Sequence, residues 1–490
     1  MSCYGYARQT TPFIDSVAQE GLLFENAYAP SSWTVPSTAT ILTGLQPQEH
    51  GLVQGILQPD NQVLRQHQLH PDSTTLAEKL RTSGYETFGY SANSHITRAM
   101  GFGQGFNTFR EINFMNAEFL EALIMQDLPS IRGSDHSAKP YFLFMHFVDP
   151  HWPYMHRPNS IRRLGIDDSS QSMQEVRVLE GDPMLHFSPG YFREHESYLR
   201  ALTDLYDGEI AAVDEVIGRI LAELPRSEQA MIAILSDHGE AFSEHDTMLH
   251  GYDLYEETVR VPLILRLPKK GGQFPPHKRI SERAMLIDIM PTLLKAAGVD
   301  KGILPGVDLT AEIPPSRETP LHLSRGPIRW HGAIVDHRKG IVHEHAGRKM
   351  LFDIQSDPGE TKDLYPQEGL SDDMNAAVER AVVINPKIVP HMITNAKIGD
   401  INKLKSLGYL SGGVGAIETP WIVSMGICPR IFDIDRQCGK EPEYLKGDCV
   451  GEKIDALKKE ICPGIKSFNL RKKCEQLRLN VAKRLCGNGS

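Results

Sequence analysis

Polar side chains follow two apolar runs of the chain, residues 141–148 and 231–235, directly where each run ends. Asp237 and His238 follow the second run, and His151 follows the first between two prolines. Open α/β sheets place ligand sites at the carboxyl ends of buried strands, and a carboxylate beside an imidazole suits a divalent metal ion. A structural turn is the simpler explanation of the Asp-His pair alone. The flanking prolines indicate an extended loop, a rigid mount for an acid–base group at His151.

A hydroxyl nucleophile is the second candidate, in the segment SSWTVPST at residues 31–38. Hydroxyl residues and a proline ahead of residues 39–45 are typical of a capped helix N-terminus. Thr34 would lie just before that N-terminus, where the helix dipole favours a developing anion. Its hydroxyl attacks once a metal or a base removes the proton. Capping and nucleophilic attack both remain open here, and His245 and His250 follow close behind the Asp-His pair.

The elements that would position these residues indicate a layered α/β fold. Apart from His146 and Arg266, residues 141–148, 231–235 and 261–267 are continuously apolar, as strands buried on both faces are. Residues 198–224 repeat apolar side chains at helical spacing, and residues 75–83 predict a shorter helix.

Composition and charge divide the 490 residues into three expected parts. Hydrophobic residues make up 40% and charged residues 23%, an ordinary globular balance, and the net charge of −10 argues against nucleic acid as the main ligand. We expect a catalytic α/β domain over residues 1–318, with a polar insertion at 155–196 that covers one face. A smaller α+β subdomain of short strands is expected over residues 319–412, and a Cys-rich helical tail over residues 413–490.

The expected tail differs from the rest of the chain in charge and cysteine content. Residues 413–490 hold 14 Lys plus Arg against 10 Asp plus Glu, and six of the seven cysteines. Cysteine spacings of 10 to 13 residues are unlike zinc-binding pairs and suit up to three disulfides, although reduced thiols in a helical tail explain them too.

The sequence alone does not decide in which cellular compartment the protein resides. No apolar run approaches the ~20 residues that a bilayer crossing needs. The opening MSCYGYARQ shows no signal peptide. We expect either a cytosolic protein or a chain whose true beginning is missing, in which case a secreted or periplasmic location fits the cysteine-rich tail.

Taken in order, these segments resemble the motifs of the sulfatase family within the alkaline phosphatase superfamily. The similarity covers roughly residues 1–410 and implies that superfamily's mixed sheet flanked by helices. The matching segments are YGY (residues 4–6), TPFID (11–15), FENAYAP (24–30), SSWTVPST (31–38), LTG (42–44), DPH (149–151), SDHG (236–239), HG (250–251), LYEE (254–257), RVP (260–262), LFD (351–353) and DPGE (357–360).

Two departures from the family pattern bear on mechanism. Thr34 stands where sulfatases have the Cys or Ser that becomes formylglycine, and Thr38 replaces an arginine. The resemblance therefore implies no formylglycine here, but a threonine nucleophile of the kind that phosphoesterases and phospho-group transferases of the superfamily use. Relatives also begin with a central strand whose acids bind metal, whereas this chain begins at Met1, just past it. We expect a truncated N-terminus, weak metal affinity and unpaired sheet edges.

The resemblance assigns a role to each candidate residue. A divalent ion (Ca, Mn, Mg or Zn) would be bound by Asp237, His238 and Thr34, with Thr34 as the nucleophile. His151 would bind a substrate oxygen or protonate the leaving group. His250, at the position of the family's lysine, would neutralise charge in the transition state.

The implied activity is metal-dependent hydrolysis of sulfate or phosphate esters, on a small-molecule, glycan-linked or lipid-linked substrate. Asn93 is a further candidate for substrate binding. The alternatives are a phospho-group transferase, a pseudoenzyme or binding protein, and a secreted scaffold whose working part is the tail.

Overall fold

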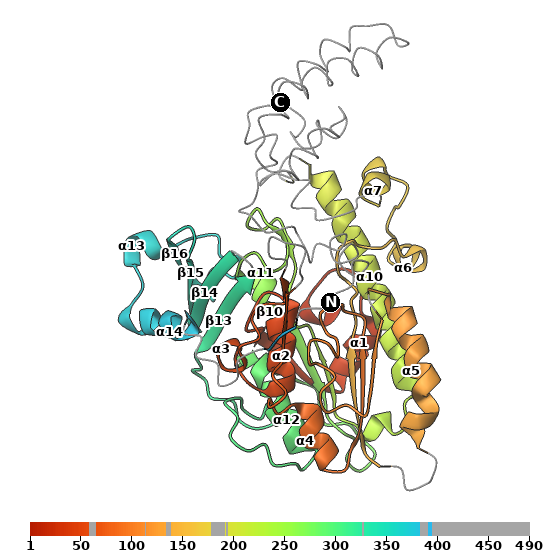
Figure 1. The fold of residues 1–490 in the computed structure, drawn as a ribbon. Helices are drawn as coiled ribbons and strands as arrows, with labels where there is room; N and C mark the ends of the chain where they lie inside the picture. The colour runs from red at the N-terminus through yellow and green to blue at the C-terminus, as the bar shows by residue number, and fades with distance from the viewer. Residues whose placement is uncertain are drawn as a thin grey trace, which may run out of the picture.

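The computed structural model describes residues 1–57, 65–112, 114–133, 139–177, 192, 195–325, 328–382 and 391–393 (Figure 1). The expected Cys-rich tail at residues 413–490 and the last part of the expected 319–412 subdomain lie outside the described residues.

A sheet built around β1 forms one half of the main body. β1 (Gly21–Tyr28) pairs antiparallel with β10 (Arg260–Arg266), and β10 pairs antiparallel with β7 (Ile232–Leu235). On its other edge β1 pairs parallel with β11 (Lys278–Ile280) and β12 (Ala284–Met285). This sheet therefore ends at β7 on the side that faces the rest of the main body.

A second sheet forms the other half. β4 (Glu86–Ser91) pairs parallel with both β5 (Thr108–Glu111) and β6 (Tyr141–His146). β6 is thus the edge strand of this sheet, as β7 is of the first. A single cavity of about 1000 Å³ borders both edge strands along their whole length. The two half-sheets consequently face each other across a gap.

Helices cover both faces of this split sheet. Apolar side chains of α1, α5 and α10 pack on one face together with those of β4, β6 and β7. The helices α2, α4 and α12 supply apolar side chains to the opposite face. Their bounds are α1 (Pro12–Gln19), α5 (Ala117–Arg132), α10 (Glu196–Glu223), α2 (Thr34–Thr43), α4 (Leu76–Thr82) and α12 (Ile289–Ala296).

Local sequence explains where two of these helices form. The Thr75 side chain accepts a hydrogen bond from the Glu78 amide, and the Glu78 carboxylate accepts one from the Thr75 amide, so a capping box starts α4. Along α10, Leu202, Leu205 and Val213 fall on the buried stripe that the apolar spacing predicts. Both predicted helices are present.

A smaller antiparallel sheet follows, in the order β13-β14-β15-β16 (Figure 1). One of its faces packs on α14, and the other joins a core cluster that includes Trp33 and Leu42 of the main body. The bounds are β13 (Thr319–Arg325), β14 (Ile328–Val335), β15 (Arg338–His343), β16 (Arg348–Asp353) and α14 (Asp372–Val382).

The remaining described elements are short. They include the hairpin of β8 and β9 beside the polar turn after β7, and two helices of the predicted insertion. Their bounds are α3 (Pro47–His50), α6 (Pro158–Arg163), α7 (Gln171–Val176), α11 (Glu256–Val259), α13 (Tyr365–Glu368), β2 (Ile56–Leu57), β3 (Arg65–Gln68), β8 (Ala241–Phe242), β9 (Met248–Leu249) and β17 (His391–Ile393).

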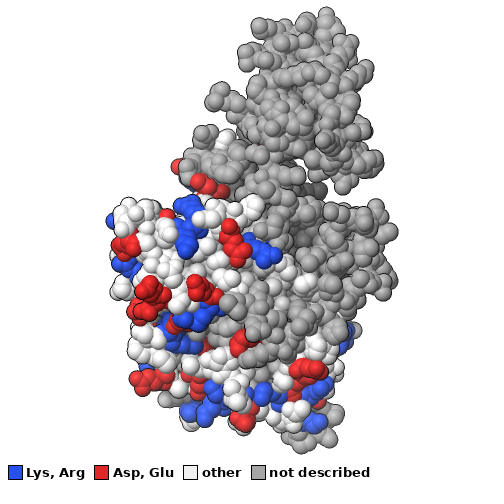
Figure 2. Space-filling view, turned by 60° about the vertical axis from the view of Figure 1, so that its left-hand side comes forward, with Lys and Arg blue, Asp and Glu red and all other residues white. Residues whose placement is uncertain are grey.

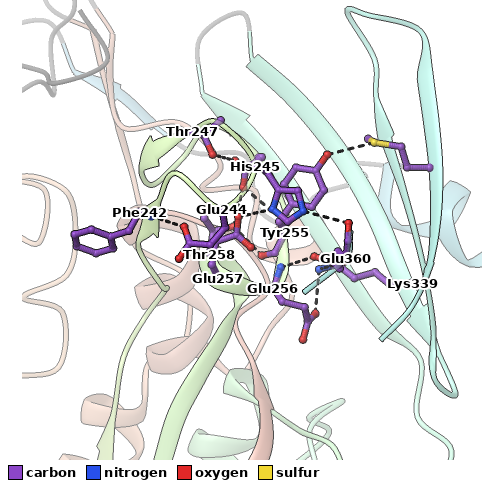
Figure 3. A network of polar contacts seen from close by, with 12 residues as sticks. Phe242, Glu244, His245, Thr247, Tyr255, Glu256, Glu257, Thr258, Lys339 and Glu360 are labelled. Carbon is purple, nitrogen blue, oxygen red and sulfur yellow. Dashed lines mark hydrogen bonds and ion pairs between the residues drawn. The ribbon is translucent and has the colours of Figure 1, made fainter. Parts of the chain in front are cut away.

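A buried ionic network joins the small sheet to the main body (Figure 3). The ammonium of Lys339, in β15, lies 3.0 Å from a carboxylate oxygen of Glu256 and 3.0 Å from one of Glu360. The Glu256 amide donates to the Glu360 carboxylate at 2.6 Å, and the Tyr28 hydroxyl donates to Glu256 at 3.0 Å. Nearby, the ring of His245 stacks on that of Tyr255. The network therefore connects β1, α11 and the small sheet.

The expected layered α/β fold is confirmed, but the burial of two strands is not. Residues 141–148 and 231–235 were expected to be buried on both faces, yet every residue of β6 and β7 is only partly buried. The cause is the gap, because each strand has a hydrogen-bonded neighbour on one edge alone among the described residues. This agrees with the expectation of unpaired sheet edges.

The described surface carries both signs of charge. On the face drawn in Figure 2, blue and red side chains are interspersed across the described part. Among the described helices, none is long and apolar enough to span a bilayer.

Candidate active site

Thr34 is the first residue of α2, whereas the sequence predicts it just before the helix. The preceding residue, Trp33, occupies the N-cap position in an extended conformation, without a side-chain cap. Thr34 is 2% exposed, and its Oγ1 lies 3.2 Å from Nε2 of His238. One turn further along α2, the Thr38 hydroxyl lies 3.5 Å from a carboxylate oxygen of Asp237. The first turn of α2 thus faces the turn that follows β7.

The orientation of His238 is set by its other ring nitrogen. Nδ1 lies 2.8 Å from the carbonyl oxygen of Gly239, which only accepts, so Nδ1 must carry the proton. In the neutral ring, Nε2 then holds a lone pair that accepts the Thr34 hydroxyl proton. Gly239 is required at this turn, because a Cβ there would collide with the backbone carbonyl of Glu257. The sequence SDHG therefore places an imidazole nitrogen beside the Thr34 hydroxyl.

Asp237 is held as a carboxylate. Burial by itself would raise the pKa of Asp237, but the neighbouring His238 and a hydrogen bond with His146 outweigh it and hold this pKa below its usual range. His146 Nε2 lies 3.5 Å from the carboxylate. His146 ends β6, on the far side of the gap, so its contribution was not evident from the sequence. A salt bridge thus spans the gap at the site whenever His146 is protonated.

Three histidine rings pack against one another beside Thr34, one pair tilted and the other edge to face. The ring of His250 lies 4.1 Å from that of His238 and 5.0 Å from that of His151, centroid to centroid. His151 Nδ1 lies 2.6 Å from the carbonyl oxygen of Trp152, to which it must donate. Burial, outweighing that bond, lowers the pKa of His151 to about 4. His151 is therefore neutral near pH 7, with the lone pair on Nε2.

His250 is paired with a carboxyl group that the sequence did not single out. Its Nδ1 lies 3.2 Å from a carboxylate oxygen of Glu240. Burial, with His238 and His151 nearby, lowers the pKa of His250 well below its usual value, and burial raises that of Glu240. Both pKa shifts favour a neutral imidazole on His250 and a neutral carboxyl group on Glu240 at neutral pH. The geometry therefore gives no support to the cationic role expected of His250.

A cation does approach this cluster from the small sheet. Arg325, the last residue of β13, donates from Nη1 to the carbonyl oxygen of His250 at 3.1 Å. Its guanidinium lies 6.0 Å from the ring centre of Trp33 and 5.3 Å from that of Tyr252. Arg325 also contributes to the lowered pKa of His151. Nothing local in the sequence marks this residue, because it comes from another sheet.

The structure brings nearly all the predicted site residues to one place. Asn93, 3% exposed, follows β4 and accepts a hydrogen bond from the His95 amide at 2.8 Å. The cavity between β6 and β7 reaches the site and is lined there by Thr34, Asn93, His151, Asp237 and His238. His245, by contrast, does not belong to this site. Its Nδ1 lies 2.7 Å from a carboxylate oxygen of Glu257, in the network of Figure 3.

The donor atoms at the site match a divalent cation in kind. An ionised carboxylate, an imidazole lone pair and a hydroxyl come together at Asp237, His238 and Thr34. Within the described ranges, however, no group of three or more His, Cys, Asp and Glu side chains could hold a metal ion. The expected three-donor set is therefore chemically suitable and small, and weak metal affinity stays a prediction.

Comparison with known proteins gives the family. The sulfatase family model matches residues 1–299, and the chain belongs to the sulfatase family. The uncharacterised sulfatase YidJ of Escherichia coli is 24% identical over 420 residues, covering 74% of this chain and 80% of the relative. The Δ4,5-hexuronate-2-O-sulfatase of Bacteroides thetaiotaomicron is 23% identical over 408 residues, covering 74% and 81%.

Solved structures share the fold. A protein crystallised with its substrate D-glucosamine-2-N,6-O-disulfate has a TM-score of 0.59 at 20% identity, over 78% of this chain and 93% of that chain. The phosphonate monoester hydrolase of Agrobacterium radiobacter has a TM-score of 0.58 at 20% identity, over 78% and 92%. The fold of this chain therefore hosts both sulfatases and a phosphonate hydrolase.

Proposed function

We propose that this protein hydrolyses phosphate or sulfate esters with Thr34 as the nucleophile, and that it prefers aryl phosphate mono- or diesters. The observation that carries the proposal is the 3.2 Å contact between Thr34 Oγ1 and His238 Nε2, with His238 oriented by Gly239. A nucleophile, a base and a group that orients the base are the parts that covalent catalysis needs. Family membership supports ester hydrolysis in general.

In the first step, His238 accepts the Thr34 proton as the hydroxyl oxygen attacks phosphorus or sulfur. The bond to the leaving oxygen breaks, and the phosphoryl or sulfuryl group stays on Thr34 as an ester. Because the His151 proton sits on Nδ1, which donates to the Trp152 carbonyl, Nε2 has no proton to give near pH 7. An aryl oxide leaves without protonation, which is why aryl esters suit this site.

The second step must release the group from Thr34. A threonine ester cannot collapse by elimination, as a formylglycine hemiacetal does, so a water molecule must attack phosphorus or sulfur. The bond to Thr34 Oγ1 then breaks, and this oxygen takes back the proton held by His238. The Nε2 lone pair of His151, beside His250 and close to the site, is suited to take the proton of that water. We therefore assign His151 the role of a base in this step, in place of the leaving-group acid expected from the resemblance.

A divalent ion is the alternative to His238 as the activator of Thr34. If Asp237, His238 and Thr34 held it, it would occupy the Nε2 lone pair of His238, so the ion and not the imidazole would make the Thr34 hydroxyl acidic, and it would stabilise the negative charge of the transferring group. Asn93 and Arg325 would contact peripheral oxygens of the substrate.

Phosphate is preferred over sulfate for a chemical reason. Sulfatases of this family expel sulfate from an aldehyde hydrate, and Thr34 cannot form one. Phosphoryl transfer depends mainly on positioning and on charge stabilisation of a loose transition state. The guanidinium of Arg325 supplies a permanent positive charge beside the site, in place of the arginine that Thr38 replaces.

A binding protein without turnover is the second candidate. It is favoured by the small set of metal donors at the site. Such a protein would retain the pocket and bind an anionic ester, for instance one linked to a glycan, without cleaving it.

The test compares 4-nitrophenyl phosphate, bis(4-nitrophenyl) phosphate and 4-nitrophenyl sulfate with Mn²⁺, Mg²⁺ or Ca²⁺. We expect a phosphate ester to turn over fastest, Thr34→Ala to abolish that activity, and Thr34→Ser to retain part of it. Fastest turnover of the sulfate ester, lost in Thr34→Ala, would refute the preference but not the nucleophile. Binding of the esters with no Thr34-dependent turnover would support the binding protein.

A further inference from the structure

The loop that carries His250 into the candidate active site has a strained backbone. Residues 243–251 follow β8 and contain β9, and we call them the His250 loop. Within it, Ser243, Asp246 and Leu249 have positive φ angles of 75°, 58° and 67°. Left-handed backbone is uncommon for residues with a side chain and is a genuine outlier for one as bulky as leucine. Such a conformation persists only where the surrounding structure holds it, so the His250 loop needs anchors.

One anchor lies at the base of the loop. The Thr247 hydroxyl donates to one carboxylate oxygen of Asp253 at 2.8 Å, and the Thr258 hydroxyl donates to the other at 3.0 Å. The Ser243 amide donates to the Thr247 carbonyl oxygen at 2.8 Å. These bonds stay within one stretch of the chain, so they shape the His250 loop without tying it to the small sheet.

The second anchor is His245, which reaches out of the loop (Figure 3). Its Nδ1 lies 2.7 Å from a carboxylate oxygen of Glu257 in α11, and its Nε2 lies 3.2 Å from the carbonyl oxygen of Glu360, which follows β16. Its ring stacks on that of Tyr255, with the centroids 3.6 Å apart and the planes within 2°. An ionised carboxylate and a carbonyl only accept, so both contacts are hydrogen bonds only when both ring nitrogens carry protons. The geometry therefore fits an imidazolium.

Acidic groups surround the His245 ring. Burial by itself would lower the pKa of His245, but the hydrogen bond to Glu257 and the charge of that carboxylate outweigh it and raise this pKa. The side chain of Glu360 pairs with Lys339, so its protonation does not remove the carbonyl oxygen that faces His245. The titratable groups that face His245 are Glu244 in the loop, Tyr255 and Glu257 at the start of α11, Asp357 and Glu360 after β16, and, through Glu360, Lys339 of β15.

We propose that His245 is a positioning residue for the candidate active site. As an imidazolium it ties the strained His250 loop to α11 and to the chain after β16, and so keeps the His250 ring packed against those of His238 and His151. When His245 loses a proton, one of its two acceptors has no donor and the loop loses that hydrogen bond. This role rests on the proposed function, in which His238 and His151 are the two bases.

The first experiment follows amide hydrogen exchange of the His250 loop in the full chain between pH 5 and pH 9. Exchange is expressed relative to the rate of an unfolded peptide at each pH. We expect the protection of residues 243–251 to fall by about tenfold as pH rises through the pKa of His245, because only the imidazolium donates to both acceptors. Protection that does not change with pH would overturn the proposal.

Glu257→Gln separates the charge from the packing. Glutamine keeps an acceptor of the same length beside Nδ1 and removes the negative charge that raises the pKa of His245, so the midpoint of the loss should move down by about one pH unit. Glu344→Gln is the matched control, because Glu344 lies 3.2 Å from Nδ1 of His331 in the small sheet, and we expect it to leave the midpoint unchanged. An unchanged midpoint in Glu257→Gln, or equal shifts in both variants, would overturn the proposal.

A second pair of variants removes the hydrogen bonds and keeps a flat ring. His245→Phe retains a ring on Tyr255 without donors, and His343→Phe is its control, since the ring of His343 stacks on that of Trp330 in the small sheet. We expect His245→Phe to speed exchange of the His250 loop about tenfold at pH 6 and to lower kcat about tenfold with little change in KM. His343→Phe should change neither. If His245→Phe does not fold, the midpoint in Glu257→Gln decides.

Failure of this role and failure of the proposed function give different results. If turnover depends on Thr34, its alkaline limit should move with the loop midpoint in Glu257→Gln. An alkaline limit that stays in place would overturn the positioning role and leave the proposed function intact. If no turnover depends on Thr34, the proposed function fails, while a shifted midpoint of loop protection in Glu257→Gln supports the anchor at His245 and an unshifted one overturns it.

Discussion

At the scale of single residues, two contacts of its ring nitrogens set the orientation of His238. One ring nitrogen donates to the Gly239 carbonyl and the other faces the Thr34 hydroxyl, so ring rotation would break both contacts. Asp237 lies beside this ring and its carboxylate stays ionised. In the proposed mechanism the two residues have separate roles: His238 aligns the Thr34 hydroxyl, and Asp237 supplies negative charge.

We predict that Asp237→Ala abolishes binding of a divalent ion while the fold remains. Asp237 follows β7 and contributes no apolar surface to the core, so its loss removes a charged donor rather than packing. Metal content after gel filtration in Mn²⁺ and the circular dichroism spectrum check this. Unchanged metal content in the variant would show that the ion binds elsewhere. Asp168→Ala, in the insertion, is the control, since its side chain contacts His156 and not the site.

The sequence predicted some of these residues and not others, for a physical reason. Thr34, Asp237 and His238 stand in short motifs whose local chemistry is visible along the chain. The pairing of His250 with Glu240 and the approach of Arg325 depend on folding of the hairpin and on packing of the small sheet. The neutral state of His250 depends on burial, which a sequence position does not reveal.

At the scale of elements, the small sheet is joined to the main body by the buried network of Figure 3. Lys339, with 0% exposure, faces two carboxylates, Glu256 and Glu360. Removing one partner of a buried ion pair leaves uncompensated charge and typically costs about 3–5 kcal/mol. The network therefore makes the docking of the small sheet sensitive to single substitutions.

We predict that Lys339→Met lowers the free energy of unfolding by about 3–5 kcal/mol. Methionine preserves the length of the side chain but leaves Glu256 and Glu360 without their cation. Lys349→Met on the neighbouring β16 is the matched control, because Lys349 is exposed and should change stability by less than about 0.5 kcal/mol. Urea unfolding of the three proteins measures both values. Equal midpoints for both variants would contradict the prediction.

We predict a pH dependence of stability from Glu360. Burial raises the pKa of Glu360 from 4.5 to about 7, although Lys339 opposes the rise. Between these values the folded state binds more protons than the unfolded state, so this contribution to stability is full below about pH 4.5 and is lost as pH rises through 7. Urea midpoints at pH 5 and pH 8 should therefore differ less in Glu360→Gln than in the parent chain. The same difference in both proteins would exclude Glu360 as the source.

At the scale of the whole molecule, the described fold closes its core clusters with residues that precede position 383. From the change in charge and cysteine content near residue 412 we expect a boundary there. We predict that a chain ending at residue 412 keeps the catalytic fold. Circular dichroism and the melting temperature of the truncated and full chains check this. Loss of cooperative melting in the truncated chain would show that the boundary at residue 412 is wrong.

An apolar run in the sequence predicts a strand but not how many neighbouring strands it has. Runs such as residues 141–148 are typical of strands with neighbours on both sides, and the pattern correctly predicts β6 and β7. The number of partners each strand finds is set by the rest of the chain, and here β6 and β7 each have one among the described residues.

The gap also divides the candidate active site between two bodies. Asn93 and His151 follow strands of one half-sheet, while Thr34 and His238 belong to the half built on β1 and β7. Among the described residues, no strand-to-strand hydrogen bond joins these halves, so the helices packed on them and the contact between His146 and Asp237 set the distance between His151 and Thr34. A ligand that bridges those two residues would favour one relative placement of the halves. By linkage, a change that holds the halves in that placement raises the affinity for such a ligand by the factor by which the ligand stabilises it.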